Sequence, residues 1–541
     1  MAGGIGPVKH MADQNPPAAP AADTAAEWRP RSSPVLIALS VMLGTFMEVL
    51  DTSVANVALP HIAGSLSATP EQATWVLTSY LISNAIVLPV TAWLSAVFGR
   101  KRFLLACVVI FTLASAACGA ATSLGMLIVA RVVQGVGGGA LQPIAQAILL
   151  ESFAPAQRGR AMAAYSMGVI VAPIMGPTLG GWITDSYSWR WIFYINLPVG
   201  FLALLMTQTF IEDPPYLQRS VLRRIDYWGL AFMAIGLATL QVVLDKGQQD
   251  DWLAAQWIRW ALTISGAAMI AFIVRELVTD EPIVNLRILA DRNFALGTIL
   301  ITAMGVVLYA TTALLPLFLQ TLLGYPALEA GLAISPRGLG ALLSAIVAGR
   351  LIGILDTRIL VVAGFGLLAL SGIWLSELTF DVAWSNIAYV TFLNGLANPL
   401  IFIALSTMAF STLRREQMGG GTGIYNLMRN LGGSVGISMA ATLLTRRAQV
   451  HQNVLVARMT PYDPAYQQRL EAIRRSLIPK VGPAVAAQQA LGILYKTVVA
   501  QATLLAFVDN FRLITVLAVC SMPLAMLLRR ARGRPPASGA H

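Results

Sequence analysis

Long apolar runs recur along this chain from Val35 onward, separated by short polar segments. A helix needs about 20 apolar residues to cross the hydrocarbon core of a bilayer. Fourteen runs reach that length, and each predicts one spanning helix. They lie near residues 35–58, 72–95, 103–122, 126–150, 161–183, 193–211, 227–245, 257–277, 294–320, 329–354, 359–377, 386–410, 419–444 and 506–528.

Three segments do not fit this pattern. Residues 1–34 are rich in Ala and Pro and contain no apolar core of a signal peptide, so we expect a disordered tail. Residues 529–541 form a second polar tail. The segment 445–506 contains four prolines and charged amphipathic stretches, which predict short helices lying outside the membrane. It is either a simple connector or a docking surface for a partner.

The composition agrees with many membrane spans. Of the 541 residues, 56% are hydrophobic and only 12% are charged, whereas about 25% of the residues of an ordinary soluble domain are charged. This excludes a soluble multidomain enzyme, and the high apolar content excludes a disordered chain. We therefore predict an all-α integral membrane protein.

The distribution of Lys and Arg predicts the orientation. The tails and short loops on the side of the N-terminus contain 22 of the 37 basic residues, while the short loops on the other side contain three. Short cytoplasmic loops retain positive charge. An even number of spans places both termini on one side, so both are expected in the cytoplasm.

Few residues suit catalysis or metal binding. The three cysteines, Cys107, Cys118 and Cys520, lie in apolar stretches without disulfide or zinc spacing, and no histidine lies inside a long apolar run. There is no phosphate-binding loop, and the basic residues are not interleaved with aromatics as in nucleic-acid-binding proteins. We therefore expect no enzyme activity, metal, cofactor or nucleic-acid partner.

Charged residues inside the predicted spans are candidates for function. A charge at the centre of a bilayer costs at least about 2.5–3.5 kcal/mol. The charged residues expected to face a cavity or a partner are therefore Glu48, Asp51, Arg131, Arg337 and Arg429. Glu48 and Asp51 are three residues apart and share a helical face. Desolvation and mutual repulsion favour the protonated forms of such a pair. Alternatively, either acid forms a static network with Arg131, and Arg429 is static too.

Small and polar residues mark two neighbouring spans. Gln134 and Gln142 follow Arg131 at helical spacing in the fourth span. The fifth span has small residues for close helix packing and prolines that permit a bend, which suit either packing alone or a gate. These gating or packing residues are Gly168, Pro173, Gly176, Pro177, Gly180 and Gly181.

With these motifs, the sequence resembles the major facilitator superfamily, and within it the fourteen-span drug:proton antiporters of the EmrB/QacA type. The long outer segment is more similar to the EmrB side of that family. The resemblance is carried by Arg131-x-x-Gln134-Gly135, by Gly168 to Gly181, by Leu50-Asp51-Thr52 to Leu59-Pro60, by Trp189 to Pro198 and by Arg224 to Gly229.

The loop after the second span departs from the family pattern. Its usual acid is replaced by Ala96, although the turn at Gly99 and the basic Arg100 are kept as gating candidates. The matching loop of the second half, Gly349 to Asp356, retains an acid, which echoes the first. The resemblance implies a major facilitator fold of 6+2+6 helices, with two pseudo-symmetric six-helix halves. These are 35–211 and 294–528, the latter including 445–506, joined by a linker with two extra spans at 212–293.

The resemblance implies a proton-driven exporter of hydrophobic drugs or toxic compounds in a bacterial inner membrane, working by alternating access. Asp51, Glu48 and Arg131 would couple protons. The implied partners are drug-like substrates, protons, lipid, and a periplasmic adaptor with an outer-membrane channel. A metabolite facilitator and a membrane sensor are the alternatives. Candidate cavity residues are Gln134, Gln142, Trp75, Tyr80, Asn84, Tyr309, Asn398 and Arg429.

Overall fold

A computed structural model of the chain describes residues 31–529 except 154–156, 214–225, 280–281, 353 and 461. The described part is helical throughout and contains no strand. The predicted tails, 1–34 and 529–541, lie almost wholly outside the described residues. So do Arg219, Arg223 and Arg224, which contributed to the predicted orientation.

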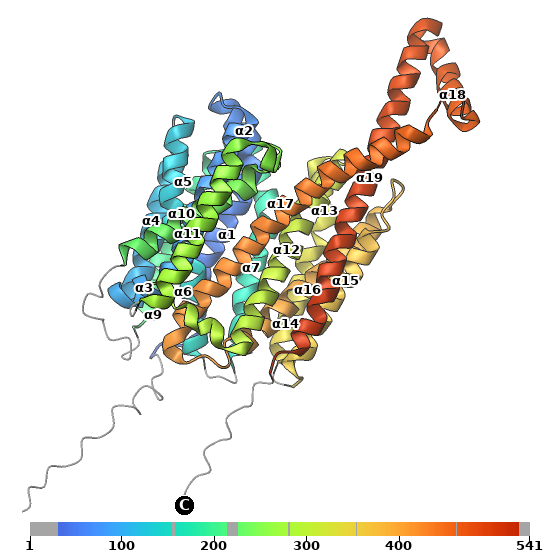
Figure 1. The fold of residues 1–541 in the computed structure, drawn as a ribbon. Coiled ribbons are helices and arrows are strands. Elements are labelled where there is room, and N and C mark those ends of the chain that lie inside the picture. The colour runs from blue at the N-terminus through green and yellow to red at the C-terminus, as the bar shows by residue number, and fades with distance from the viewer. Residues whose placement is uncertain are drawn as a thin grey trace, which may run out of the picture.

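The helices occur in three groups along the chain (Figure 1). The first group, the N-half, is α1 (Pro34–Ser65), α2 (Pro70–Ala73), α3 (Trp75–Phe98), α4 (Arg100–Gly119), α5 (Leu124–Gly138), α6 (Leu141–Ser152), α7 (Arg158–Ser186), α8 (Trp191–Tyr194) and α9 (Asn196–Phe210). The second, the inserted pair, is α10 (Tyr227–Lys246) and α11 (Gln256–Val278), with the short helix η2 (Trp252–Ala254) between them and η3 (Leu286–Ala290) after them. The third, the C-half, is α12 (Arg292–Thr321), α13 (Ala327–Ile334), α14 (Pro336–Leu351), α15 (Thr357–Leu375), α16 (Trp384–Ala409), η4 (Arg415–Gln417), α17 (Met418–Arg458), α18 (Pro464–Val481) and α19 (Pro483–Met526).

Each of the fourteen predicted spans falls on helix. Twelve helical segments among the described residues are long and apolar enough to cross a membrane. The other two predicted spans, 161–183 and 419–444, fall on α7 and α17. Both run through the bundle, where α7 packs on α1 and α17 packs on α12. The all-α fold class is confirmed.

Four predicted spans are interrupted. The second is divided into α2 and α3, the fourth into α5 and α6 at residues 139–140, the sixth into α8 and α9, and the tenth into α13 and α14. The division of the fourth span matters most, because Arg131 and Gln134 lie on α5 whereas Gln142 lies on α6.

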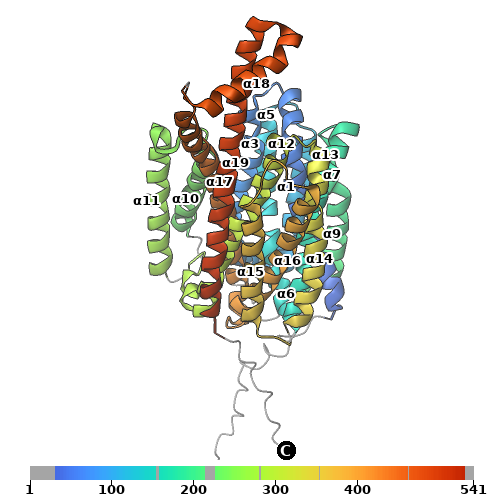
Figure 2. The ribbon, with the colours of Figure 1, turned by 90° about the vertical axis from the view of Figure 1, so that its right-hand side faces the viewer.

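The prediction that the outer segment 445–506 forms only short helices is wrong, because two long helices of the bundle continue into it. Helices α17 and α19 continue beyond the bundle as unbroken rods, and α18 joins them into a hairpin that stands away from the other helices (Figures 1 and 2). The backbone of α17 continues because no proline occurs between Met418 and Arg458. A turn at Gly482, with φ of +79°, begins α19.

The N-terminal end of α1 and the C-terminal end of α19 lie at the end of the bundle opposite this hairpin (Figures 1 and 2). We call these the terminal end and the hairpin end. The inserted pair lies at one side, where α10 packs on α3 and α17 and α11 is peripheral (Figure 2).

The contacts of α17 with the N-half lie toward the terminal end. Along α17, Gly419 lies beside Ala92 and Gly423 lies beside the Leu88 carbonyl. Asn426 and Arg429 follow one and two turns later, with hydrogen bonds to α6. Further along, α17 diverges from the N-half and contacts the inserted pair instead.

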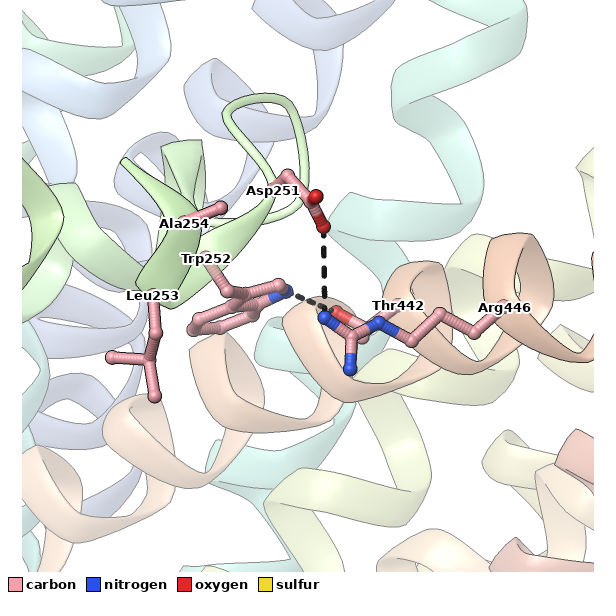
Figure 3. A pocket seen from close by; sticks show the side chains of 6 residues that line it. All are labelled: Asp251, Trp252, Leu253, Ala254, Thr442 and Arg446. Atoms are coloured by element: carbon pink, nitrogen blue, oxygen red, sulfur yellow. Dashed lines mark hydrogen bonds and ion pairs between the residues drawn. The ribbon is translucent and has the colours of Figure 1, made fainter. Parts of the chain in front are cut away.

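The outer loop of the inserted pair is tied to α17 around a cavity of about 420 Å³ (Figure 3). The Trp252 indole N–H donates to Thr442 Oγ1 over 3.0 Å, and Arg446 lies 3.6 Å from Asp251. Asp251 and Trp252 both have positive φ, of 53° and 52°. Such backbone costs about 1–3 kcal/mol per residue, so the surrounding contacts must hold this loop.

Candidate functional site

The carboxylate of Asp51 is surrounded by three donor side chains from two other helices, α5 and α9. Arg131 NH1 of α5 approaches Oδ2 at 2.5 Å, and Gln134 and Asn196 donate to Oδ1 over 2.9 and 2.8 Å. Both partners of the ion pair are buried, with side-chain exposures of 0% for Arg131 and 1% for Asp51. We call Asp51, Arg131, Gln134 and Asn196 the Asp51 network. It lies wholly within the N-half.

Arg131 is held in place on several sides. Its Nε donates to the Val76 carbonyl over 3.1 Å, and NH1 also donates to Gln134 Oε1 over 2.7 Å. Its guanidinium lies over the rings of Tyr80 and Phe193, at 4.5 and 5.5 Å from their centroids. Cation–π contacts and buried hydrogen bonds together fix this side chain.

Glu48 lies one turn away on α1 and has neutral partners. Gln142 Nε2 of α6 donates to Oε2 over 2.6 Å. Tyr80 and Asn84 of α3 donate to Oε1 over 3.2 and 3.3 Å. We call Glu48, Tyr80, Asn84, Gln142 and Arg429 the Glu48 network.

Arg429 brings the C-half into this network. Its NH2 donates to Gln142 Oε1, so the Gln142 amide lies between the carboxylate of Glu48 and the guanidinium of Arg429. The guanidinium also lies 5.6 Å from the ring centroid of Phe402. The Glu48 network therefore crosses from one half of the protein to the other.

A second hydrogen bond, between two side-chain amides, crosses the same interface. Asn426 Nδ2 of α17 donates to Gln146 Oε1 of α6 over 2.8 Å. Gln146 is one turn from Gln142, and Asn426 is one turn from Arg429. This second bridge belongs to neither carboxylate network.

The other predicted cavity residues lie apart from these networks. Trp75 lies beside the inserted pair, with Lys246 Nζ 5.7 Å from its ring centroid. Tyr309 packs against Gly433 of α17. Asn398 is buried in α16 and donates to Asn394. Their contact with a substrate stays a prediction.

The small residues of α7 lie against α1. A methyl group at Gly180 would approach Val54 Cγ1 to 2.8 Å, and one at Gly176 would come closer still to Ser53. Gly168 faces Met42, whereas a methyl group at Gly181 would meet open space. The carbonyl of Pro173 accepts a hydrogen bond from Ser53 Oγ over 3.4 Å.

Helix α7 continues through both prolines as one element. Pro177 lies within it, and its side chain is outside the described residues.

Ala96, expected in a loop, lies in the last turn of α3, and the short connection from α3 to α4 is contacted by acids from elsewhere in the fold. Gly99, with φ of +85°, connects α3 to α4. Arg100 forms a buried ion pair with Glu151 at the end of α6. Asp213 accepts from the backbone N–H of Lys101 over 2.7 Å, which satisfies the first turn of α4.

Four residues at the site were not predicted from the sequence: Asn196, Glu151, Asp213 and Asn426. The sequence does contain a signal for the first two. Asn196 is an isolated amide within an apolar run, and Glu151 is an acid at the end of another. Each of these isolated polar groups needs a partner in a membrane. Among the described residues, no group of three or more His, Cys, Asp or Glu side chains could hold a metal ion.

Comparisons with known proteins agree with this architecture. Residues 41–437 match the model of the Major Facilitator Superfamily. The chain is 39% identical over 435 residues to the multidrug export protein EmrB of Escherichia coli (strain K12), covering 80% of this chain and 84% of that protein. It is 35% identical over 497 residues to the fatty acid resistance protein FarB of Neisseria gonorrhoeae, covering 91% and 96%.

Two further similarities are more distant. The colistin resistance protein EmrB of Acinetobacter baumannii is 29% identical over 512 residues, with coverage of 94% of this chain and 99% of that protein. A solved structure of the human organic anion transporter MFSD10 superposes with a TM-score of 0.56 at 13% identity, covering 90% of this chain and all of that one. At that identity, the likeness shows the fold alone.

Proposed function

This chain belongs to the major facilitator superfamily, in its EmrB-type branch, and we propose that it exports hydrophobic and amphiphilic toxic compounds in exchange for protons. The family consists of multi-pass membrane transporters. The relatives that it resembles over most of its length are named for multidrug export and for resistance to fatty acids or colistin. We expect no enzyme activity and no cofactor, because the proton gradient supplies the energy.

The observation that carries the proposal is the Glu48 network. A buried carboxylate that accepts only from neutral side chains is costly to keep ionised in a low-dielectric site. Protonation makes Glu48 neutral and breaks no direct ion pair, because the nearest cation, Arg429, is separated from it by the Gln142 amide. Asp51 differs, because its protonation would leave Arg131 buried without a counter-charge. We therefore assign proton exchange to Glu48 and the support of its helix to the Asp51 network.

The proposed orientation places the terminal end in the cytoplasm, in agreement with the distribution of Lys and Arg. Along α17, the described contacts with the N-half then lie on the cytoplasmic side, and toward the periplasm α17 contacts the inserted pair instead. This supports a cytoplasmic side that is closed along α17. The halves correspond to residues 35–211 and 294–528, with the inserted pair within 212–293.

A drug:proton antiporter binds its proton while the central site faces the periplasm and the cytoplasmic side is closed. Protonation would allow the cytoplasmic side to open, and release of the proton there would precede export of the next substrate.

The hairpin supports a periplasmic partner. It extends beyond the bundle and exposes apolar side chains on its helices and on the turn between α17 and α18. Among them are Val454, Tyr462, Ile478, Val485 and Tyr495. Exposed apolar surface of this kind indicates a protein interface. We propose that an adaptor protein leading to an outer-membrane channel binds there. Affinity capture of the adaptor should be lost in Val454→Asp and Tyr462→Asp and kept in Leu253→Asp, which lies outside the hairpin.

Everted membrane vesicles from a pump-deficient bacterial host test the transport proposal. Respiration acidifies their interior, and a pH-sensitive dye reports proton release when a compound is transported. We expect release on addition of a long-chain fatty acid or a lipophilic dye, and none in vesicles lacking the protein. Transport of one metabolite without proton release would favour a facilitator, and no transport of any compound would favour a sensor.

A further inference from the structure

We propose that Gln142 transmits the protonation state of Glu48 to the C-half, by holding its hydrogen bond to Arg429 only while Glu48 is ionised. This inference rests on the proposed function, because it requires Glu48 to exchange protons. It assigns Gln142 and Arg429 as positioning residues, and it gives a physical route from the proton to the change in conformation.

The first step is the orientation of the Gln142 amide. An ionised carboxylate can only accept hydrogen bonds, so the amide must turn its Nε2 toward Glu48 Oε2, 2.6 Å away. The carbonyl oxygen of Gln142 then faces Arg429, where it accepts from NH2. Both charges favour the same amide orientation, and each hydrogen bond polarises the other.

The second step is protonation. The added proton turns Glu48 into a donor, and its O–H can bond to the Gln142 carbonyl oxygen once the amide rotates by half a turn. That rotation points Nε2–H toward the N–H groups of Arg429, so two donors face each other and the bond between the halves is lost. Even without rotation, the Gln142 bond to Glu48 no longer has a charged acceptor, and charge-assisted bonds are about twice as strong as neutral ones.

The position of this bond gives it control over the interface. Along α17, the described contacts with the N-half begin at Gly419 and continue through Gly423 and Asn426 to Arg429. Ser434 already contacts Gln241 of the inserted pair. Among these contacts of α17, Arg429 therefore lies furthest from the terminal end. Releasing it removes the innermost of the hydrogen bonds between α17 and α6.

The surroundings contain other titratable groups, and their positions leave Glu48 as the acid in contact with Gln142. Asp51, on the same helix, is paired with Arg131 and does not bond to Gln142. The charged and titratable groups that face Glu48 from its own helix and from the helices around it are Asp51 on α1, Tyr80 on α3, Tyr165 on α7 and Arg429 on α17. The tyrosines stay neutral over the physiological pH range, since their ordinary pKa is about 10.

Spin-label distance measurements test the proposal in the full-length protein in lipid nanodiscs. Arg102→Cys and Ile359→Cys place labels on exposed positions at the terminal ends of the two halves, in a background of C107A, C118A and C520S. We expect the wild-type background to show longer distances on acidification, as the closed side opens. Gln142→Met should remove this pH-dependent shift.

Gln146→Met is the matched control, because Gln146 also bonds to α17 from one turn away but does not contact Glu48. It should keep the shift. Arg429→Met should behave like Gln142→Met, and Arg429→Lys, which retains a donor, should restore part of the response. The arginine variants also test the proposal if Gln142→Met does not fold.

An infrared C=O band of a protonated carboxyl, assigned by its loss in Glu48→Gln, distinguishes proton binding at Glu48 from transmission of the protonation state to the C-half. If the band appears on acidification in Gln142→Met while the distance shift is absent, the proton binds but is not transmitted, as proposed. A full shift in Gln142→Met, or a loss of the shift in Gln146→Met, would overturn the inference. If the wild type shows neither band nor shift, the assignment of proton exchange to Glu48 is wrong.

Discussion

Glu48 and Asp51 stand one turn apart on the same helix, and both are buried, yet their surroundings differ in kind. Asp51 has a fixed cation at 2.5 Å and amide donors from its own half. Glu48 has neutral donors, and its nearest cation, Arg429, lies behind the Gln142 amide and belongs to the other half. Sequence spacing alone would treat the two acids as equivalent.

The difference teaches that burial does not make a carboxylate a proton carrier. A group can exchange protons reversibly when both of its charge states have tolerable surroundings. For Asp51 the neutral state is penalised, because it leaves Arg131 uncompensated. For Glu48 both states are served by side chains that can donate or accept. The conformational consequence also differs, since only the Glu48 network spans the interface between the halves.

Removing the charge of Asp51 should give the largest effect. In Asp51→Asn, Arg131 stays buried without a counter-charge, and breaking a buried pair in this way costs about 3–5 kcal/mol. We expect a large fall in the thermal unfolding temperature in detergent, together with loss of transport. The double variant Asp51→Asn with Arg131→Met should regain most of the stability, because it removes both charges. If Asp51→Asn is as stable as the wild type and only proton coupling is lost, the two acids have the opposite roles.

Neutralising Glu48 should disable coupling and leave the fold intact. In Glu48→Gln, the amide can still accept from Tyr80 and Asn84 and can bond to Gln142, so the unfolding temperature should stay near that of the wild type. Export driven by a pH gradient in proteoliposomes should fall at least tenfold. Any residual export should no longer vary with pH. A variant that keeps pH-dependent export would exclude Glu48 as the proton site.

The fold could be read from the sequence because hydropathy is a local property. All fourteen apolar runs fall on helix, and twelve of the described helical segments are long and apolar enough to cross a membrane. The hairpin was less predictable, since the charges after residue 444 indicate an end to the apolar run but not to the helix. Helix α17 continues through them because its backbone bonds need no apolar side chains.

The site was predictable only in part. The pairing of Asp51 with Arg131 follows from the rule that intramembrane charges find partners. The bond between Gln142 and Arg429 depends on which face of α17 meets α6, and nothing in either segment specifies that. The stripe from Arg131 to Gln142 looks continuous in sequence, but the division between α5 and α6 sends its two ends to different acids.

Truncation of one amide side chain beside each acid compares Asp51 with Glu48 through smaller losses of stability. In Asn196→Ala, Asp51 loses one hydrogen bond to a charged group, which is worth about 1.5–3 kcal/mol. We expect lower thermal stability with an unchanged pH profile of transport. In Asn84→Ala, ionised Glu48 loses a longer hydrogen bond, of 3.3 Å, so the stability loss should be smaller. Because that donor favours the ionised form, the midpoint of the pH profile should move to higher pH. The comparison fails if Asn196→Ala moves the midpoint and Asn84→Ala does not.

The smallest effect should come from the packing of α7 on the Asp51 end of α1. Substitution of two adjacent glycines by alanine should change the stability in opposite directions there. A methyl group at Gly180 would lie 2.8 Å from Val54 Cγ1 and 3.2 Å from the Val54 Cα. Such overpacking costs about 1–3 kcal/mol, and the better helix propensity of Ala returns about 0.5–1 kcal/mol. Gly180→Ala should therefore lower stability by about 0.5–2 kcal/mol, measured as a modest fall in unfolding temperature.

Gly181→Ala adds the same methyl group one residue later, where it meets nothing within 4 Å. Only the propensity gain of about 0.5–1 kcal/mol remains, so the unfolding temperature should rise slightly. Both variants leave the Glu48 network untouched and should keep the wild-type pH profile. If Gly180→Ala instead flattens that profile without loss of stability, then α7 takes part in coupling. In that case the Asp51 end of α1 is a moving element rather than the support on which Glu48 is carried.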